Sequence, residues 1–360
     1  MADMSDAELH EIYDFAVQLG KDAGDLLMKF AMARFTGGAV GEQAFEEKDN
    51  AVDIVTKVDQ DMEAFIRSSI EKKYPSHAFL GEESYSAGAS RDYLVTAAPT
   101  WIIDPLDGTV NFTHLFPLFC VSIGFALHGR PVIGVINAPF LHQLFTACRG
   151  RGAWLNDTQP LPLLRDPGVP PCPPPPPRAA SLPASGARTA ATSPTATCTA
   201  RSRALSTWPP RLAAATARAP WSTACGVLGG ESACSESMPL DESMPLDESM
   251  PLDDATLDLA YTAMGAFDIW WEGGCWEWDV AAGIAILEEA GGLVTTANPP
   301  DDAATVDIPE AKLGGRLYLA IRPAGPSDTE TGRQGQERVV REVWRRVREL
   351  DYARPGVESK

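Results

Sequence analysis

The chain has 360 residues, of which 44% are hydrophobic and 22% charged, a composition typical of a globular protein with one or two domains. Its formal net charge of −19 argues against a nucleic-acid partner, because a phosphate backbone requires a basic protein surface. Seven cysteines without C-x-x-C spacing fit a reducing compartment, and no apolar run is long enough to span a membrane. We therefore predict a soluble, cytoplasmic protein with no membrane partner.

Two amphipathic helices and a short strand are predicted at the start of the chain. Apolar residues recur at helical spacing in both helices, a capping box precedes the first, and a proline follows the second. The predicted elements are a helix from Ser5 to Phe30, a helix that starts near Asp59 and ends before Pro75, a strand at 78–80 and a loop at 85–100.

The stretch 101–112 places two carboxylates where a buried strand ends. Asp104 and Asp107 follow three apolar residues, and we expect the chain to leave the sheet at Pro105, which cannot donate a ladder hydrogen bond. Gly108 permits a tight turn, after which a helix can begin with its free N–H groups facing the carboxylates. Such a place suits a cation and a phosphate together, although a plain strand end with an Asp-Gly turn has the same pattern.

Strands continue after this turn until the composition changes near residue 159. The predicted strands are 120–127, 132–137 and 144–146, which completes an α+β pattern. Ten of the eighteen residues 160–177 are proline, and residues 236–253 repeat Glu-Ser-Met-Pro-Leu-Asp three times. We predict that about 160–252 is largely disordered, because it cannot bury enough apolar surface to offset its chain entropy.

The predicted organisation is an N-terminal α+β half at 1–158, a low-complexity segment at 159–252 and a C-terminal α/β half at 253–360. The segment is either a regulatory linker or an out-of-frame translated insert, and its abrupt change of composition favours the second interpretation. In the C-terminal half the predicted elements are a helix at 257–267, a strand at 267–271, a helix at 280–287, a strand at 317–321 and a helix at 337–350.

Acidic residues recur at strand and helix ends along the chain, namely Asp59, Glu82, Asp104, Asp107 and Asp279. Hard oxygen ligands without nearby His or Cys select Mg²⁺, Mn²⁺ or Ca²⁺ over zinc. Two Mg²⁺ ions about 3.5–4 Å apart need a bridging carboxylate and can activate water while neutralising a leaving phosphate oxygen. Asp104 is the natural bridge in this set. Taken singly, each acid is more often a helix cap or a solvated charge than a metal ligand, and Asp279 in particular fits a cap.

These motifs resemble the signature motifs of the inositol monophosphatase family. The resemblance covers about residues 5–158 and 253–325, in the same order. It rests on Lys48, 53–59, 81–84, 104–112, 271–273 and 278–283. It implies a layered αβαβα sandwich, usually a homodimer, and a phosphomonoesterase that requires two or three Mg²⁺ ions and is inhibited by Li⁺.

The resemblance also implies roles for individual residues. The implied metal ligands are Glu82, Asp104, the Leu106 carbonyl, Asp107 and Asp279, and the implied catalytic residues are Asp59, Thr109 and Glu82. The implied substrate-binding residues are Asp107, Gly108, Thr109, Ala255 and Glu272. Backbone N–H groups of Gly108 and Thr109 would hold the phosphate, and Glu272 would meet the inositol hydroxyls with Asp107. Water would attack phosphorus in line, without a covalent phosphoenzyme.

One short stretch departs from the family pattern. Asp253-Asp254-Ala255-Thr256 stands where similar proteins carry Gly-(Ser/Thr)-Ala-Ala at a helix start beside the phosphate. Carboxylates there would repel a bound phosphate by about 1–4 kcal/mol at partly exposed distances. The family's second-half strands also have no recognisable counterpart between about 160 and 252, so sheet edges would be exposed. Both differences put the stability, dimerisation and activity of the chain in question.

Three alternative functions remain open. A haloacid-dehalogenase-type phosphatase needs its two acids two positions apart, whereas Asp104 and Asp107 are three apart, and it leaves Glu82 and Asp279 without a role. A non-catalytic protein that binds metal or inositol phosphate is the second alternative. The third keeps the fold but acts on a bisphosphate nucleotide, fructose bisphosphate or another small phosphomonoester, whereas the sequence at 272–274 favours inositol monophosphate.

Overall fold

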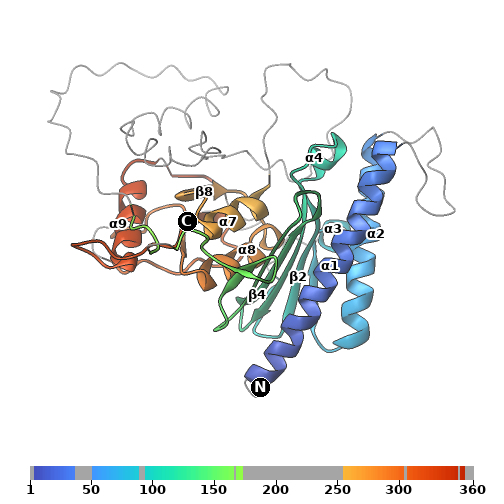
Figure 1. Ribbon diagram of the computed structural model, residues 1–360, viewed down its shortest axis with the longest axis horizontal. Coiled ribbons are helices and arrows are strands. Elements are labelled where there is room, and N and C mark those ends of the chain that lie inside the picture. Colours follow the sequence, from blue (N-terminus) through green and yellow to red (C-terminus); the bar gives the residue numbers. More distant parts are fainter. Residues whose placement is uncertain are drawn as a thin grey trace.

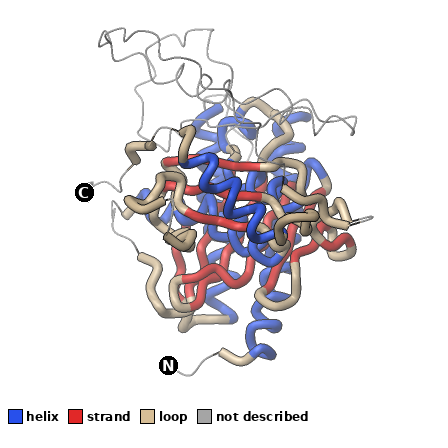
Figure 2. Tube along the Cα trace, turned by 90° about the vertical axis from the view of Figure 1, so that its left-hand side faces the viewer, coloured by secondary structure: helices blue, strands red, loops and turns tan. Residues whose placement is uncertain are grey.

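The computed structural model describes residues 4–36, 51–88, 94–165, 168–172, 254–303, 306–347 and 349–352. The described residues form an α+β fold of five layers, in the order helices, sheet, helices, sheet, helix. Figure 1 shows these layers from right to left, and Figure 2 views them from the side of the last helix. The predicted αβαβα sandwich is therefore confirmed.

The larger sheet has seven strands among the described residues, and their order in space follows their order in the chain. The first two strands are parallel and all later neighbours are antiparallel. The strands are β1 Ala78–Gly81, β2 Thr100–Asp107, β3 Cys120–Leu127, β4 Arg130–Ala138, β5 Gln143–Cys148, β6 Ala153–Leu155 and β7 Gln159–Pro160. A 3₁₀ turn, η1 Pro139–Leu141, joins β4 to β5.

Two long helices, α1 Asp6–Thr36 and α2 Ala51–Lys73, cover one face of this sheet. The predicted start of the second helix near Asp59 is wrong, because α2 begins eight residues earlier. The added turns contain the β-branched residues Val55 and Val58, which have low helix propensity but are only 1% and 2% exposed on the face that packs on the core. Tertiary burial thus outweighs local preference here.

The other face of the sheet is covered by α7 Ala255–Met264 and α8 Glu277–Glu289. Beyond them lies a three-stranded antiparallel sheet in the order β8 Ile269–Gly273, β10 Leu317–Ile321 and β9 Leu293–Thr295, followed by α9 Gly332–Trp344. The predicted terminal helix at 337–350 is displaced in the structure, because Thr331 and Gln334 form a capping box that starts α9 earlier.

Strand β2 does not end at Pro105, contrary to the prediction. It continues to Asp107, and its register with β3 shifts, since Asp104 pairs with Ser122 and Asp107 pairs with Cys120. Between these two pairs the chain advances three residues on β2 but only two on β3, so β2 contains a bulge with one extra residue. A bulge accommodates Pro105, because a residue without an N–H can sit where ladder bonding is interrupted. Both carboxylates therefore stay attached to the sheet. Two short helices follow the ends of β1 and β2. They are α3 Glu82–Ala87, whose last three residues fall in the predicted loop 85–100, and α4 Thr109–Thr113.

The start of the proline-rich stretch is packed on the folded chain. Leu161 and Cys172 are 1% and 6% exposed, and the Arg322 guanidinium donates hydrogen bonds to the carbonyls of Pro170 (3.0 Å) and Pro171 (2.9 Å). The described fold therefore extends past the predicted boundary at 158. Residues 173–253 lie outside the described residues. They include most of the predicted low-complexity segment and its hexapeptide repeat, whose disorder stays a prediction.

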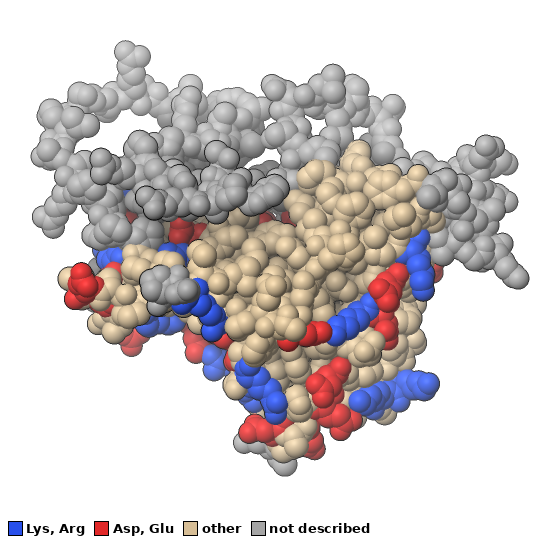
Figure 3. All heavy atoms as spheres, in the orientation of Figure 1, with Lys and Arg blue, Asp and Glu red and all other residues tan. Residues whose placement is uncertain are grey.

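Charges of both signs are interspersed on the face shown in Figure 3, and neither sign forms a continuous patch over the described residues there. Exposed ion pairs among the described residues, such as Lys21–Asp157 and Arg67–Glu71, contribute little to stability. None of the described helices combines the length and the apolar character that a membrane-spanning helix requires.

A pair of glycines lets α8 lie directly on the larger sheet. Gly124 and Gly134 are register partners on β3 and β4. A Cβ added at Gly124 would lie 2.8 Å from the Ala281 Cβ, and one at Gly134 would collide with the carbonyl oxygen of Ala282. The Ser122 hydroxyl also donates to the Trp278 carbonyl at 3.2 Å. This close packing places the first turn of α8 beside the end of β2.

We predict that Gly134→Ala lowers the free energy of unfolding by about 1–3 kcal/mol, because the new methyl group meets helix backbone that cannot rotate away. Urea unfolding followed by tryptophan fluorescence measures the change. Gly168→Ala is the matched control, since an added Cβ there meets nothing within 4 Å. Equal stability of the two variants would contradict direct contact between α8 and β4.

Candidate active site

The acidic residues that the sequence singles out gather where β2 ends and where α3, α4 and α8 begin. The turn after β2 is held by its own side chains. Asp104 Oδ1 accepts a hydrogen bond from the Leu106 N–H, and the Thr109 hydroxyl donates to the Leu106 carbonyl, both at 3.0 Å. Gly108 has φ +83°, and a Cβ there would lie 2.7 Å from the Leu118 carbonyl oxygen. Only glycine suits this turn.

Asp107 links β2 to the start of α7. One of its oxygens accepts from the Gly108 N–H and the other from the Thr256 N–H, each at 3.0 Å. The Thr256 hydroxyl in turn donates to the Asp279 carbonyl at 2.8 Å. One carboxylate and one threonine thus join β2 to α7 and α8, with 149 positions between Asp107 and Thr256 and 23 between Thr256 and Asp279.

Asp279 caps a helix, as the sequence allowed, and also lies near the other acids, while its role as a metal ligand stays a prediction. Its Oδ2 accepts a hydrogen bond from the Trp276 N–H at 2.7 Å, so it caps the first turn of α8. The same side chain is buried at 6% exposure and lies within electrostatic range of the other acids. Burial raises its pKa well above the ordinary value, and the charges of Asp107 and Glu82 raise it further.

Glu82 is placed by Glu63, a residue that the sequence reasoning missed. Glu63 is 4% exposed on α2, and its carboxylate accepts from the Glu83 N–H at 2.8 Å and the Ser84 N–H at 2.9 Å. It thereby satisfies the free N–H groups at the start of α3, of which Glu82 is the first residue. Its position four residues after Asp59, on the same face of one helix, was the signal available in the sequence.

The buried acids raise one another's pKa. Burial raises the pKa of Glu82 to about 8, and the charges of Glu83 and Asp107 raise it further, whereas a hydrogen bond with the Asp104 carboxyl lowers it. The pKa of Asp104 is raised well above its ordinary value, first by burial and then by Glu82, Asp107 and Asp279. Asp59 is raised likewise, by burial and then by Glu82. Among the described residues, none of these acids forms an ion pair with Lys or Arg.

Such a set fits divalent cations. Carboxylate and carbonyl oxygens are the ligands that Mg²⁺ takes, and buried carboxylates that face one another need a cation or bound protons between them. Asp59 Oδ1 is buried and has no hydrogen-bond partner among the described residues, so it has unused acceptor capacity. The acids that would hold the metal are Glu82, Asp104, Asp107 and Asp279, together with the Leu106 carbonyl.

The other predicted site residues lie around this group. Ala255 is the first residue of α7, next to Thr256, and Glu272 is a 3% exposed residue of β8 whose charge acts on Asp279. One expectation differs: the Gly108 N–H, predicted to hold phosphate, donates to the Asp107 carboxylate instead. Lys48 and Asp253 lie outside the described residues, as does the side chain of Asp53.

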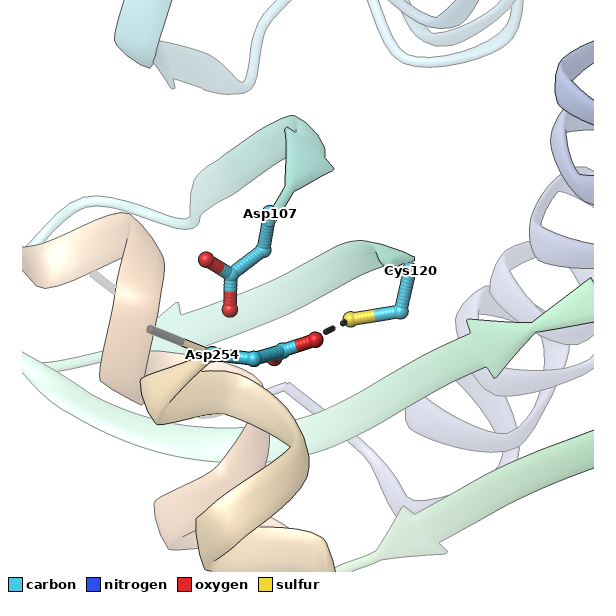
Figure 4. Close-up of side chains that lie close together, drawn as sticks. All are labelled: Asp107, Cys120 and Asp254. Atoms are coloured by element: carbon cyan, nitrogen blue, oxygen red, sulfur yellow. Dashed lines mark hydrogen bonds between the residues drawn. The ribbon is translucent and has the colours of Figure 1, made fainter. Parts of the chain in front are cut away.

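Cys120 and Asp254 lie against Asp107 in a cluster that the sequence did not predict as a group. Asp254 caps α7 by accepting from the Leu257 N–H at 2.8 Å, and the Cys120 thiol donates to Asp254 Oδ1 at 3.8 Å (Figure 4). Burial raises the pKa of Asp254 and of the Cys120 thiol well above their ordinary values, and the neighbouring charge of Asp107 raises the pKa of Asp254 further. Asp107 and Cys120 are register partners across β2 and β3, a pairing that the local sequence does not show.

Comparisons with known proteins agree with this architecture. Residues 8–348 match the model of the inositol monophosphatase family. Quinic acid degradation cluster protein x of Neurospora crassa is 55% identical over 97% of both chains, and inositol monophosphatase 2 of Saccharomyces cerevisiae is 35% identical over 86% of this chain and 88% of its own. A solved inositol monophosphatase from Anabaena has the same fold, with a TM-score of 0.52 at 22% identity, over 96% of this chain and 98% of that chain. With a family match across nearly its whole length, the chain belongs to the inositol monophosphatase family.

Proposed function

We propose that the protein hydrolyses inositol monophosphate to inositol and phosphate in a Mg²⁺-dependent, Li⁺-sensitive reaction. Membership of the family makes it a phosphoric monoester hydrolase. The observation that carries the proposal is the gathering of Glu82, Asp104, Asp107 and Asp279, of which Asp104 and Asp279 are buried and the other two half-buried, without cationic partners among the described residues. Two or three Mg²⁺ ions held there would polarise the phosphate, activate water and neutralise the leaving oxygen.

The surrounding residues are suited to orient the reactants. The Thr109 hydroxyl donates to the Leu106 carbonyl, which leaves its oxygen lone pairs to accept a hydrogen bond from the attacking water. Asp59 Oδ1, buried and without a partner, is a second acceptor for that water. Two oriented acceptors fix the direction of its attack on phosphorus, and positioning of this kind supplies much of the catalysis in phosphoryl transfer.

The substrate would be recognised by acceptors at one end and by N–H donors at the other. Glu272, buried on β8 close to Asp279, and Asp107 are acceptors for ring hydroxyls. The Thr256 N–H at the start of α7 and the N–H groups of Gly108 and Thr109 would meet the phosphate. In the structure, Asp107 accepts from two of these donors, so substrate binding would require this carboxylate to turn toward the metal.

A different small phosphomonoester is a second candidate substrate. The relatives at 55% and 53% identity are named quinic acid degradation cluster protein x and protein qutG, whereas the yeast inositol monophosphatase 2 is 35% identical. Quinic acid is itself a polyhydroxylated cyclohexane ring, so a phosphate ester of such a ring acid would offer Glu272 and Asp107 similar hydroxyl groups.

The central test is Asp104→Asn, which we expect to abolish Mg²⁺-dependent phosphate release from inositol monophosphate. The amide keeps the shape and the acceptor for the Leu106 N–H but removes the bridging charge. Circular dichroism should show an unchanged fold. Asp301→Asn, at an exposed turn, is the control and should keep full activity. Turnover by the Asp104 variant comparable to wild type would refute the bridging role.

Substrate preference is tested by comparing kcat/KM for inositol monophosphate with kcat/KM for phosphate esters of quinic acid. The proposal predicts that inositol monophosphate is preferred by at least about tenfold, equivalent to about 1.4 kcal/mol of transition-state stabilisation. A preference of that size for the quinic acid esters would instead support the second candidate. Hydrolysis of both substrates depends on the same acids, so Asp104→Asn should abolish both activities. The mechanism is thereby tested separately from the choice of substrate.

Asp254→Ser should raise affinity for phosphate, because the buried Asp254 carboxylate lies against Asp107 at the start of α7. Serine keeps a cap acceptor for the Leu257 N–H and removes the charge. A repulsion of about 1–4 kcal/mol corresponds to at least about a fivefold fall in the inhibition constant of inorganic phosphate. Asp328→Ser, on an exposed loop, is the matched control. An unchanged inhibition constant would show that Asp254 does not act on the phosphate.

A further inference from the structure

We propose that Asp107, Cys120 and Asp254 form a binding site for a thiophilic divalent cation of the Zn²⁺ class, beside the predicted Mg²⁺ centre. The proposal stands on these three side chains alone and does not require the proposed function. It differs from the oxygen-only set around Asp104, because it contains a sulfur ligand and a carboxylate from α7.

The geometry is that of a compact three-ligand site. One ligand atom from each side chain lies within 4.8 Å of the other two, and Cys120 Sγ and Asp254 Oδ1 are 3.8 Å apart. A tetrahedral zinc ion, with Zn–S of about 2.3 Å and Zn–O of about 2.0 Å, separates its ligand atoms by roughly 3.5 Å. Small side-chain rotations therefore suffice to close the site. Figure 4 shows the three side chains pointing toward one another from three segments.

The backbone fixes the positions of all three ligands. Asp107 and Cys120 are register partners at the end of β2 and the start of β3. Asp254 is the N-cap of α7, and its Oδ1 is fixed by the Leu257 N–H at 2.8 Å. The ligands thus belong to regular elements of the core, which gives a metal site its rigidity.

A second observation also favours a cation at this cluster. Asp254 is 3% exposed, its Oδ2 accepts no hydrogen bond from an N–H or O–H donor among the described residues, and its carboxyl lies within hydrogen-bonding reach of the Asp107 carboxyl. Neither Asp107 nor Asp254 forms an ion pair with a described Lys or Arg. A buried carboxylate without a partner is costly, and a coordinated cation would compensate both acids at once.

The ligand types select the metal. Thiolate sulfur prefers Zn²⁺ and similar ions, whereas Mg²⁺ takes oxygen ligands and retains its water. Three protein ligands leave one tetrahedral position open for water or an anion. Binding would displace the Cys120 thiol proton to solvent, because a coordinating thiol is deprotonated. If the proposed function holds, sharing of Asp107 would also make the thiophilic ion an inhibitor of Mg²⁺-dependent hydrolysis.

Co²⁺ is the probe for this site, since a thiolate bound to Co²⁺ gives a near-ultraviolet charge-transfer band. Titration of the metal-stripped full-length chain should give the band with one equivalent, and added Zn²⁺ should remove it. We expect Cys120→Ser and Cys120→Ala to lose the band and Asp254→Asn to weaken Zn²⁺ binding by at least about tenfold in equilibrium dialysis. Circular dichroism checks that each variant is folded.

Cys148→Ser is the matched control, because Cys148 is also a buried free thiol in the same sheet but does not belong to the cluster. All cysteines other than the mutated one remain in each variant. The band is therefore assigned to the Cys120 thiolate only if it is lost in the Cys120 variants and kept in Cys148→Ser. A wild-type chain without the band, or a band of full intensity in folded Cys120→Ala, would overturn the site. Hydrolysis with Mg²⁺ alone is measured separately, so failure of the zinc site and failure of the proposed function give different results.

Discussion

The structure depends on holding several carboxylates close together in a buried place. Two like charges 4 Å apart repel by about 4 kcal/mol at an effective dielectric constant of 20, so the fold must oppose this repulsion. It does so with backbone hydrogen bonds, since Asp104, Asp107 and Asp279 each accept at least one N–H from a turn or helix start. These bonds orient the acids, but they do not neutralise them. Cations bound between the acids would complete the balance, and for this reason we propose a metal-dependent chemistry.

The larger sheet and α8 bring these acids together, and small residues at their contact are decisive. Gly124 and Gly134 let the helix lie against strand backbone, which places Asp279 beside the end of β2. The bulge in β2 keeps Asp104 and Asp107 attached to the sheet while the chain turns toward α4. The same three-segment junction also contains Thr256, whose N–H and hydroxyl bind β2 and α8. The contacts that pack the core therefore also set the geometry of the site.

Local patterns in the sequence correctly predicted those elements whose bounds depend on residues nearby in the chain. The strands at 120–127 and 317–321 have the predicted bounds, because continuous apolar runs of that length have few other solutions. The start of α2 and the course of β2 through Pro105 could not be predicted, since burial and a bulge against another strand decide them. The repeated placement of the acids at element ends suggested that they gather, and in the structure Glu82, Asp104, Asp107 and Asp279 lie within electrostatic range of one another, while their metal-binding roles stay a prediction.

Contacts between residues far apart in the chain could not be predicted from local sequence patterns. Cys120 begins an apolar strand, so it looked like a core residue, and its contact with Asp254 joins residues 134 positions apart. Asp254 was predicted to disturb phosphate binding, but the sequence could not show that its carboxylate caps α7 and lies against Asp107.

The most direct test of the proposed metal centre is anomalous diffraction from crystals soaked in Mn²⁺. The account predicts peaks between Glu82, Asp104, Asp107 and Asp279, and Mn²⁺ bound only elsewhere would contradict it.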